Sequence, residues 1–371
     1  MSSKTIVDTH IRRARAVNPH INALVQTRFD AAIDEAVAAD AAAASGVELG
    51  PLHGVPCTIK ESFAVVGMRQ TSGLVARKDN VAQQDATTVA RLKAAGAIII
   101  GTTNVSELLM WLESSNRVYG RSNNPYDTRR IAGGSSGGEG AIIGASASPL
   151  GLGADIGGSI RLPAFFNGVF GHKPTGGLVP ATGQYPLAEN AALRYLASGP
   201  IARRATDLML LTKILAGPDG VDPSTVDPKT ADVQLGDPAA VEISKLKVLV
   251  VPGNGAQRVS RDMLAAQARA ADALSKLGAD VSYGEIPELK RSFDIWSQSM
   301  AAADDTSFRT MLGNGNPVPL LKSYGQLLVG RGVHTLPALV LATVEKLPMF
   351  VPSDTTPMVA FGQRLRDRLR D

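Results

Sequence analysis

A glycine- and serine-rich stretch in the middle of the chain constrains its fold more than any other feature. Between Gly133 and Gly158, ten of the 26 residues are glycine, against about 7% in proteins generally. Glycine is used where the backbone must adopt positive φ or approach another group closely. Aliphatic residues such as Ile142 and Leu152 interleave with these glycines. The stretch therefore belongs to a packed core, because a flexible linker would have no reason to carry aliphatic side chains.

Composition narrows the class of protein further. The 371 residues are 44% hydrophobic and 19% charged, which is typical of a globular protein with a sizeable core. The net charge of +4 is scattered along the chain, whereas nucleic-acid binding needs a clustered basic face, so no nucleic-acid partner is predicted. The single cysteine, Cys57, suits a reducing compartment. No secretory profile and no apolar run of about 18 residues is present, so we expect a cytoplasmic location without a transmembrane segment.

Hydrophobic periodicity predicts an α/β fold. The pattern predicts a helix from residue 5 and a second, alanine-rich helix from Phe29 to about residue 44. It also predicts helices over residues 87–95, 106–113, 199–217 and 261–277, and largely helical structure from residue 292 onward. It predicts strands over residues 54–60, 97–100, 247–252 and 281–283. The last two strands with the helix between them form an αβ crossover, the unit of a sheet covered by helices. Because no internal repeat or linker interrupts the chain, we predict one domain over residues 1–371.

The glycine-rich segment has two further interpretations besides the one we favour. A phosphate-binding P-loop needs Lys followed by Ser or Thr after its glycines, and Glu139 lies there instead. Residues 133–137 also match the G-x-S-x-G elbow of α/β-hydrolases. That chemistry requires a downstream acid and histidine, and only His172 and His334 follow, neither in a recognisable loop context.

Ser159 is the stronger candidate nucleophile. It follows Ile156-Gly157-Gly158, a run of backbone N–H groups with little side-chain bulk that can converge on one oxygen, as an oxyanion hole requires. The serine then needs a base. The five histidines show no pairing pattern, so we expect surface or helix-end positions for them. A lysine can act as the base if it is neutral.

Residues 133–175 resemble the amidase signature family. The match covers the whole stretch in order, including residues 155–161 and 171–175, and it extends outward to residues 18–23, 54–61 and 199–219. Glu139 and residues 107–114 are most similar to the fatty-acid amide hydrolase branch. The resemblance implies a single domain with a central mixed, twisted β-sheet covered by helices on both faces, and a signature core at about residues 128–176. It implies a hydrolase that cleaves carboxylic amides.

The resemblance also implies the roles of individual residues. Ser159 corresponds to the acylated nucleophile, Ser135 to a bridging serine that follows a cis peptide bond, and Lys60 to the general base. Ser136 competes with Ser135 for the bridging role. The backbone amides of Ile156, Gly157, Gly158 and Ser159 correspond to the oxyanion hole.

Elementary energetics allow this arrangement. Keeping a lysine neutral at pH 7 costs roughly 4–5 kcal/mol, and burial in an apolar pocket can shift a lysine that far. The residues before Lys60 are apolar, and Glu61 should point to the opposite face of the strand. No clustered ligand spacing indicates a metal, and the chemistry needs no cofactor.

Substrate and partners are less constrained by the sequence. Met110 and Trp111 are candidates for an acyl pocket, although an ordinary core helix explains their pattern equally well. We expect a small-molecule amide as substrate, with apolar or fatty-acyl amides as one option. Family members continue beyond the point that matches Asp371, so a C-terminal portion or a partner chain would complete the sheet; a homodimer also stays open. The alternatives are an amidotransferase A-type subunit that releases ammonia to a partner, and an inactive truncated scaffold.

Overall fold

The computed structural model describes residues 1–187, 190–228, 235–303, 306–345 and 355–370. These residues form two compact units. The first contains Met1–Leu235 and Thr306–Lys346, and the second contains Gly236–Asp305 and Leu347–Asp371. All predicted site residues belong to the first unit. The extent of the predicted domain, residues 1–371, and of its signature core stays a prediction.

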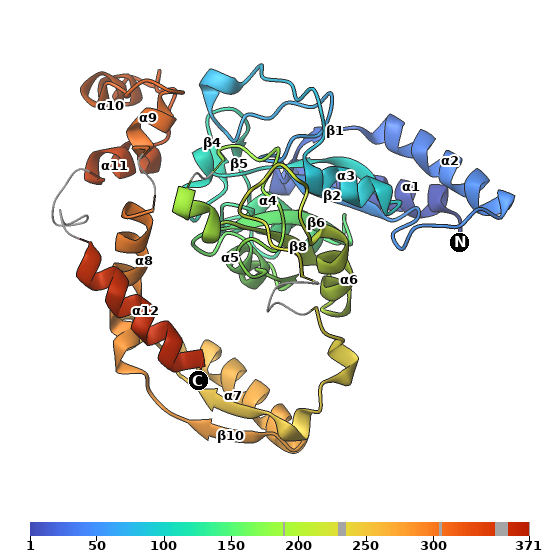
Figure 1. The fold of residues 1–371 in the computed structure, drawn as a ribbon. Coiled ribbons are helices and arrows are strands. Elements are labelled where there is room, and N and C mark those ends of the chain that lie inside the picture. Colours follow the sequence, from blue (N-terminus) through green and yellow to red (C-terminus); the bar gives the residue numbers. More distant parts are fainter. Residues whose placement is uncertain (188–189, 229–234, 304–305, 346–354, 371) are drawn as a thin grey trace. The chain divides into compact units, whose positions relative to one another are not determined.

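A mixed six-stranded sheet forms the centre of the first unit (Figure 1). The strand order is β1-β3-β2-β6-β8-β7. The strands are β1 (Leu24–Thr27), β3 (Ile98–Thr103), β2 (Pro56–Lys60), β6 (Leu150–Asp155), β8 (Ala197–Ala202) and β7 (Phe170–Gly171). The central strands β3, β2 and β6 are parallel, while β1 and β8 run antiparallel to their neighbours. The predicted α/β fold with a mixed sheet is therefore confirmed.

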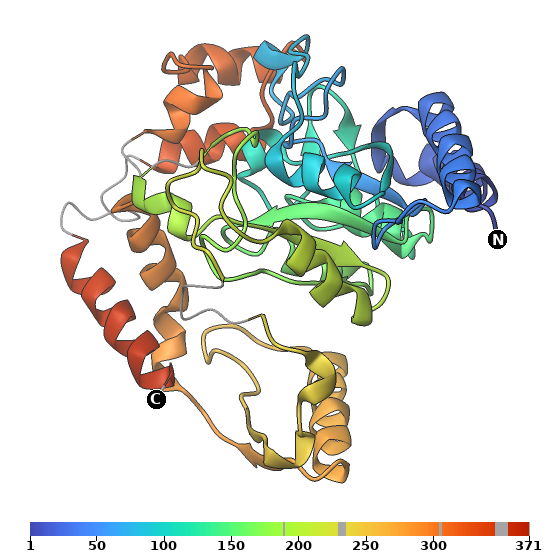
Figure 2. The same cartoon turned by 45° about the vertical axis from the view of Figure 1, so that its right-hand side comes forward.

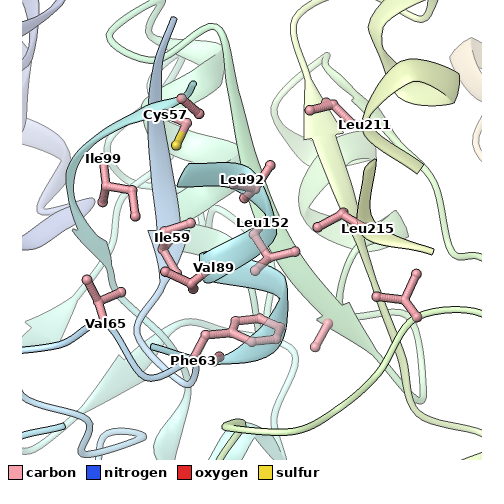
Figure 3. Packing of buried hydrophobic residues seen from close by; sticks show 14 of the residues in the cluster. Cys57, Ile59, Phe63, Val65, Val89, Leu92, Ile99, Leu152, Leu211 and Leu215 are labelled. Carbon is pink, nitrogen blue, oxygen red and sulfur yellow. The ribbon is translucent and has the colours of Figure 1, made fainter. Parts of the chain in front are cut away.

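Helices cover both faces of this sheet. The helices are α1 (Ser3–Ile21), α2 (Phe29–Ser45), α3 (Thr87–Ala94), α4 (Gly137–Gly144), α5 (Arg161–Phe166) and α6 (Thr206–Leu215). On one face, α3 and α6 share a hydrophobic core with Cys57 and Ile59 of β2 (Figure 3). On the other face, α1, α4 and α5 share a second core. Since side chains alternate along a strand, Thr58 and Lys60 point toward the α4 face.

A small third core holds α9 (Phe308–Leu312), α10 (Leu320–Leu328) and α11 (Leu336–Val344) in the same unit. Leu74 and Leu108 contribute to it from the N-terminal part of the chain. Leu108 is fully buried there, with φ at 51°. This core thus fixes the segment that follows β3.

The structure corrects two predicted elements and adds a strand between two others. Residues 106–113 form no full helix: only a short 3-10 turn, Glu107–Leu109, is present, because Leu108 and Leu109 adopt positive φ and Ser106 Oγ donates to the Trp111 carbonyl at 2.9 Å. The two helices predicted between residues 5 and 44 are present as α1 and α2; strand β1, which was not predicted, lies between them, since the Asn18 side chain accepts the amides of residues 23 and 24 and turns the chain. Residues 197–202 form strand β8, which overlaps the start of the helix predicted over residues 199–217. Because every residue of β8 is buried, its sequence lacks the alternation of apolar and polar residues that distinguishes a strand from a helix.

The second unit contains the predicted αβ crossover (Figures 1 and 2, yellow to orange). Its elements are β9 (Lys247–Val250), α7 (Arg261–Lys276), β10 (Asp280–Tyr283), α8 (Ser292–Ala301) and α12 (Thr356–Arg370). The strands β9 and β10 pair in parallel. Of their eight residues only Val250 is buried. None of the helices in the described part of the chain combines the length and apolar character needed to cross a bilayer.

Candidate active site

The candidate site lies at the carboxyl ends of two adjacent parallel strands. Thr58 and Ile59 of β2 pair with Gly151 and Leu152 of β6. Lys60 ends β2 and Asp155 ends β6, so the loop after Asp155 begins at the edge of the sheet where Lys60 lies. Such edges are where open α/β sheets build their binding sites.

Lys60 is fully buried at this edge. Its Nζ donates to Ser135 Oγ at 2.8 Å and to the Ala154 carbonyl at 3.2 Å. Burial lowers the pKa of Lys60 to about 7, although the negative charge of Asp155, and that of Glu139 when it is ionised, oppose that shift. A substantial fraction of the Lys60 side chain is therefore neutral near pH 7 and able to accept a proton.

Ser135 lies in a tightly held turn before α4. The Gly134–Ser135 peptide bond is cis, as the family resemblance implies. A Cβ at position 134 would lie 2.7 Å from the Trp111 carbonyl oxygen, so only glycine fits there. Ser114, which sequence reasoning missed, is fully buried; its Oγ donates to the Ser135 carbonyl at 3.1 Å and accepts the Gly137 amide at 2.8 Å.

Residues 156–159, here called the nucleophile loop, are organised by the carboxylate of Asp155. Asp155 accepts the amides of Gly158 at 2.7 Å and Ile160 at 3.1 Å, and both of its oxygens bind Arg161 at 2.9 Å. Burial would raise the pKa of Asp155, but the Arg161 hydrogen bonds and nearby positive charge keep it well below the usual range. Because Asp155 and Arg161 flank Ser159, the sequence favours a structural ion pair between them over a direct catalytic role, and the structure contains that ion pair.

Ser159 is brought beside the Ser135 turn by the backbone. The Ser136 amide donates to the Ser159 carbonyl at 3.2 Å. The Ser159 side chain is half-buried, and within the described ranges its hydroxyl makes no hydrogen bond. Ser136 is fully buried, and its Oγ lies 3.4 Å from the Ala154 carbonyl.

The four predicted oxyanion donors differ in what they contact. The Gly158 N–H is held by Asp155. The amides of Gly157 and Ser159 donate to no other group in the part of the chain that the structure describes. Gly157 is exposed. Of the four amides, only that of Gly158 therefore has an acceptor among the described residues, and the oxyanion-hole role of the set stays a prediction.

Lys173 is a further charged residue at the nucleophile loop. It lies in the segment after β7, and its Nζ donates to the Ile156 carbonyl at 3.1 Å and to the Tyr195 carbonyl at 2.9 Å. Its Nζ also lies 3.4 Å from Asp155 Oδ1. Burial lowers the pKa of Lys173. The sequence pattern contained Lys173 but gave it no role.

Glu139 is the one acidic side chain that α4 adds near Lys60. It is fully buried and accepts hydrogen bonds from Thr58 Oγ1 at 2.6 Å and Thr103 Oγ1 at 2.9 Å. Burial raises the pKa of Glu139 to about 8. Glu61, by contrast, is bound by Tyr119 and by the amides of residues 71 and 72, away from Lys60 as expected.

The remaining predicted residues lie as follows. Met110 and Trp111 are 41% and 43% exposed on the loop that contacts Gly134, and the fold alone assigns them no substrate. His334 is not at the surface as expected: it is buried, with Nδ1 2.8 Å from Glu107 Oε1. Among the residues the structure describes, no cluster of three or more His, Cys, Asp or Glu could hold a metal ion.

Comparison with known proteins shows the family to which the chain belongs. The family model "Amidase" matches residues 5–330. The chain is 41% identical over 384 aligned residues to human fatty-acid amide hydrolase 2, covering 99% of this chain and 70% of that protein. It is 34% identical to the A-type subunit of the glutamyl-tRNA(Gln) amidotransferase of Symbiobacterium thermophilum, over 80% of this chain and 60% of that one.

A solved structure agrees with the sequence comparisons. The peptide amidase of Stenotrophomonas maltophilia superposes with a TM-score of 0.76 at 26% identity, over 98% of this chain and 76% of that one. Fold and relatives together define an enzyme that hydrolyses amide bonds. The chain belongs to the amidase family.

Proposed function

We propose that this protein hydrolyses carboxylic amides through an acyl-enzyme on Ser159, with Ser135 and Lys60 as its proton relay. The observation that carries the proposal is the 2.8 Å hydrogen bond between the Nζ of fully buried Lys60 and Ser135 Oγ. A buried amine with a pKa of about 7 is a base matched to neutral pH. The nucleophile loop begins at the same sheet edge, and its residue Ser159 is half-buried.

The proposed reaction has two halves. As Ser159 Oγ attacks the amide carbonyl, its proton passes to Ser135 and the Ser135 proton passes to neutral Lys60. The proton then returns through Ser135 to the leaving nitrogen, the C–N bond breaks, and the amine departs from the acyl-enzyme. A water molecule is deprotonated by the same relay and attacks the ester, which releases the acid and restores Ser159.

The negative charge that develops on the carbonyl oxygen needs fixed donors. We assign this role to the amides of Ile156, Gly157 and Ser159 in the nucleophile loop. Gly158 instead fixes the loop by donating to Asp155 at 2.7 Å. Preorganised backbone donors of this kind are typically the largest single contribution to acyl-transfer catalysis.

Apolar or fatty-acyl amides are the proposed substrate class. Support comes from the 41% identity to a protein named fatty-acid amide hydrolase 2. It also comes from Met110, Trp111 and Leu112, which are all more than 40% exposed on the loop beside Gly134. Exposed apolar side chains beside a reactive centre suit an acyl chain.

Covalent labelling tests the proposal directly. The full chain is treated with a fluorophosphonate and digested for mass spectrometry, alongside Ser159→Ala, Lys60→Ala and, as a control, His172→Ala. We expect labelling of Ser159 in the wild type and in His172→Ala, and turnover of a decanoyl p-nitroanilide in both. Ser159→Ala should take no label. Attachment at another residue would overturn the assignment, and a wild-type chain that takes no label would favour the inactive scaffold.

A second candidate is an amidotransferase subunit that releases ammonia to a partner. The observation that favours it is the 34% identity to the A-type subunit of a glutamyl-tRNA(Gln) amidotransferase. Release of ammonia from glutamine with no turnover of acyl anilides would support this candidate. The cytoplasmic location, a homodimer and a completing partner chain stay predictions.

A further inference from the structure

Lys173 binds the carbonyl that begins the nucleophile loop. Its Nζ donates to the Ile156 carbonyl oxygen at 3.1 Å. Ile156 and Gly157 share one peptide unit, so this contact acts on the group that also carries the Gly157 N–H. No other side chain in the described part of the chain donates to that carbonyl.

The geometry of a trans peptide makes this contact directional. The peptide unit is planar, and its C=O and N–H bonds point in opposite directions. Holding the Ile156 carbonyl toward Lys173 therefore turns the Gly157 N–H away from Lys173. Gly157 has no side chain that could restrain the plane in another way, and its N–H meets no acceptor within the described residues.

Charge adds a second effect. An ammonium at the carbonyl end of a peptide polarises the group, which makes its N–H a stronger donor. Lys173 is well placed for this because its side chain is only 23% exposed. Burial removes the water that would otherwise weaken the interaction.

Lys173 also forms an ion pair with Asp155, but this contact is the longest of the three that its Nζ makes. Both oxygens of Asp155 are already bound by Arg161 at 2.9 Å. The contact from Lys173 Nζ to Asp155 is longer, at 3.4 Å, than its contacts with the two carbonyls. The Tyr195 carbonyl, at 2.9 Å, anchors the ammonium so that it remains at Ile156.

We propose that Lys173 is a positioning residue that aims and polarises the Gly157 N–H as an oxyanion donor. The inference rests on the proposed function of the nucleophile loop. Among the described residues, Lys173 makes no hydrogen bond to the hydroxyl of Ser135 or Ser159. Lys173 acts through the Ile156–Gly157 peptide unit, and it contributes when the carbonyl oxygen of the substrate becomes negative.

Three substitutions separate the effect of Lys173 on the orientation of the Gly157 N–H from the effect of its positive charge. Lys173→Met keeps the length and loses both hydrogen bonds and charge, Lys173→Gln keeps a neutral donor, and Lys173→Arg keeps the charge. The control is Lys213→Met, which removes an exposed lysine from α6. For each variant, kcat and KM are measured with decanoyl p-nitroanilide. The inhibition constant is measured for a decyl-chain trifluoromethyl ketone, whose serine adduct carries an oxyanion.

We expect substitution of Lys173 to weaken binding of the charged ketone adduct more than binding of the neutral substrate. Lys173→Met should lower kcat about 10- to 100-fold, since removing one oxyanion donor outright costs about 100- to 1,000-fold. Its KM should stay within about threefold, and the ketone should bind more weakly by the factor lost in kcat/KM. Lys173→Gln and Lys173→Arg should each recover part of the loss, and Lys213→Met should match the wild type.

Other outcomes overturn the inference. If kcat of both Lys173→Met and Lys173→Gln stays within twofold of the wild type, Lys173 has no part in oxyanion binding. If KM rises as much as ketone binding weakens, the site has been disordered in general. Fluorophosphonate labelling of the same variants keeps the two proposals apart, because a label on Ser159 upholds the proposed nucleophile whatever Lys173 does.

Discussion

Two parallel strand pairs in this molecule have the same hydrogen-bond pattern but different surroundings. In β2 and β6 of the first unit every residue is buried. In β9 and β10 of the second unit only Val250 is buried. Each pair includes a strand that has a lysine at one end: Lys60 ends β2 without any exposed surface, and Lys247 begins β9 as an exposed residue.

The comparison shows what turns an ordinary strand end into a reactive one. Burial lowers the pKa of Lys60 to about 7 and leaves its amine with a hydroxyl partner, Ser135. A solvated lysine gains no such reactivity, because water stabilises its charged form. Reactivity at this site should therefore follow burial and hydrogen bonding and not the αβ framework itself. Matched substitutions in the two strand pairs test that statement.

The largest expected effect is the loss of the base. We expect Lys60→Met to lower kcat/KM about 10⁴-fold or more, as loss of one member of a serine-protease triad does. The matched change in the exposed pair, Lys247→Met, should leave kcat/KM within twofold. Both are measured with decanoyl p-nitroanilide. If kcat/KM of Lys60→Met stayed within tenfold of the wild-type value, buried Lys60 would not be the base.

The same Lys60→Met variant should be more stable than the wild type. Each pKa unit is worth about 1.4 kcal/mol, so lowering the Lys60 pKa from 10.5 to about 7 costs on the order of 4–5 kcal/mol. Because the folded pKa is the lower one, this cost is full below pH 7 and fades as the pH rises toward the unfolded value. We expect a gain of roughly 1–3 kcal/mol at pH 7 in denaturant unfolding, since two hydrogen bonds are also lost. The gain should shrink by pH 9.5.

Loss of the carboxylate that organises the nucleophile loop should have the next largest effect. Asp155→Asn can accept with only one side-chain oxygen, so it cannot hold Gly158, Ile160 and Arg161 together. We expect kcat to fall about 100- to 1,000-fold, in the range of a lost oxyanion donor. Asp280→Asn, at the start of exposed β10, is the control and should keep full activity. Equal activities for the two variants would contradict the role of Asp155.

The dependence of activity on pH should be smaller than the effects of these substitutions. Only the neutral form of Lys60 can accept a proton, so kcat/KM should fall about tenfold per pH unit below pH 7. Burial also raises the pKa of Glu61 to about 7, so that carboxyl could produce the same inflection. Glu61→Gln separates them: the inflection near pH 7 should persist in that variant. Its disappearance would assign the inflection to Glu61, and a wild-type profile that is flat down to pH 5 would exclude both groups.

The burial of the region that contains Lys60 could largely be predicted from the sequence. The apolar run before Lys60 and the glycine-rich core indicated a buried strand and a packed loop, and the structure contains both. The proximity of residues 60, 135 and 159 came from the family resemblance, since 75 residues of chain separate Lys60 from Ser135. No local pattern encodes a contact over that separation.

Other features gave no signal in the sequence. Residues 106–112 have helical hydrophobicity, yet Leu108 is turned into a distant core formed with Phe308 and Leu312. His334 is buried because its Nδ1 finds a hydrogen-bond partner in Glu107, 227 residues away. Ser114 and Lys173 act on backbone groups, and hydrogen bonds to backbone leave no trace in residue type. These interactions depend on tertiary contacts alone.

Ser114 offers a smaller test in the buried region. Ser114→Ala leaves the Gly137 amide and the Ser135 carbonyl without their partner, and each unsatisfied buried group costs about 1–3 kcal/mol. We expect kcat to fall about tenfold as the Ser135 turn loosens, with Lys60 and Ser159 unaltered. Ser282→Ala in exposed β10 loses only a 3.5 Å contact to the Val248 carbonyl and should show no change. A Ser114→Ala variant with wild-type kcat would mean that the Gly134–Ser135 turn holds without this side chain.

The smallest effect should come from the exposed strand pair itself. Leu249 on β9 is 52% exposed, whereas Leu152 on β6 is fully buried. Leu249→Thr keeps a residue that favours strands and removes little buried apolar surface, so kcat/KM should stay within twofold. Leu152→Thr, at the register partner of Ile59, should lose both stability and activity because it leaves a buried hydroxyl and a cavity. If Leu249→Thr instead lowered kcat/KM tenfold or more, the exposed pair would have to support the site, and burial could no longer be what separates the two regions.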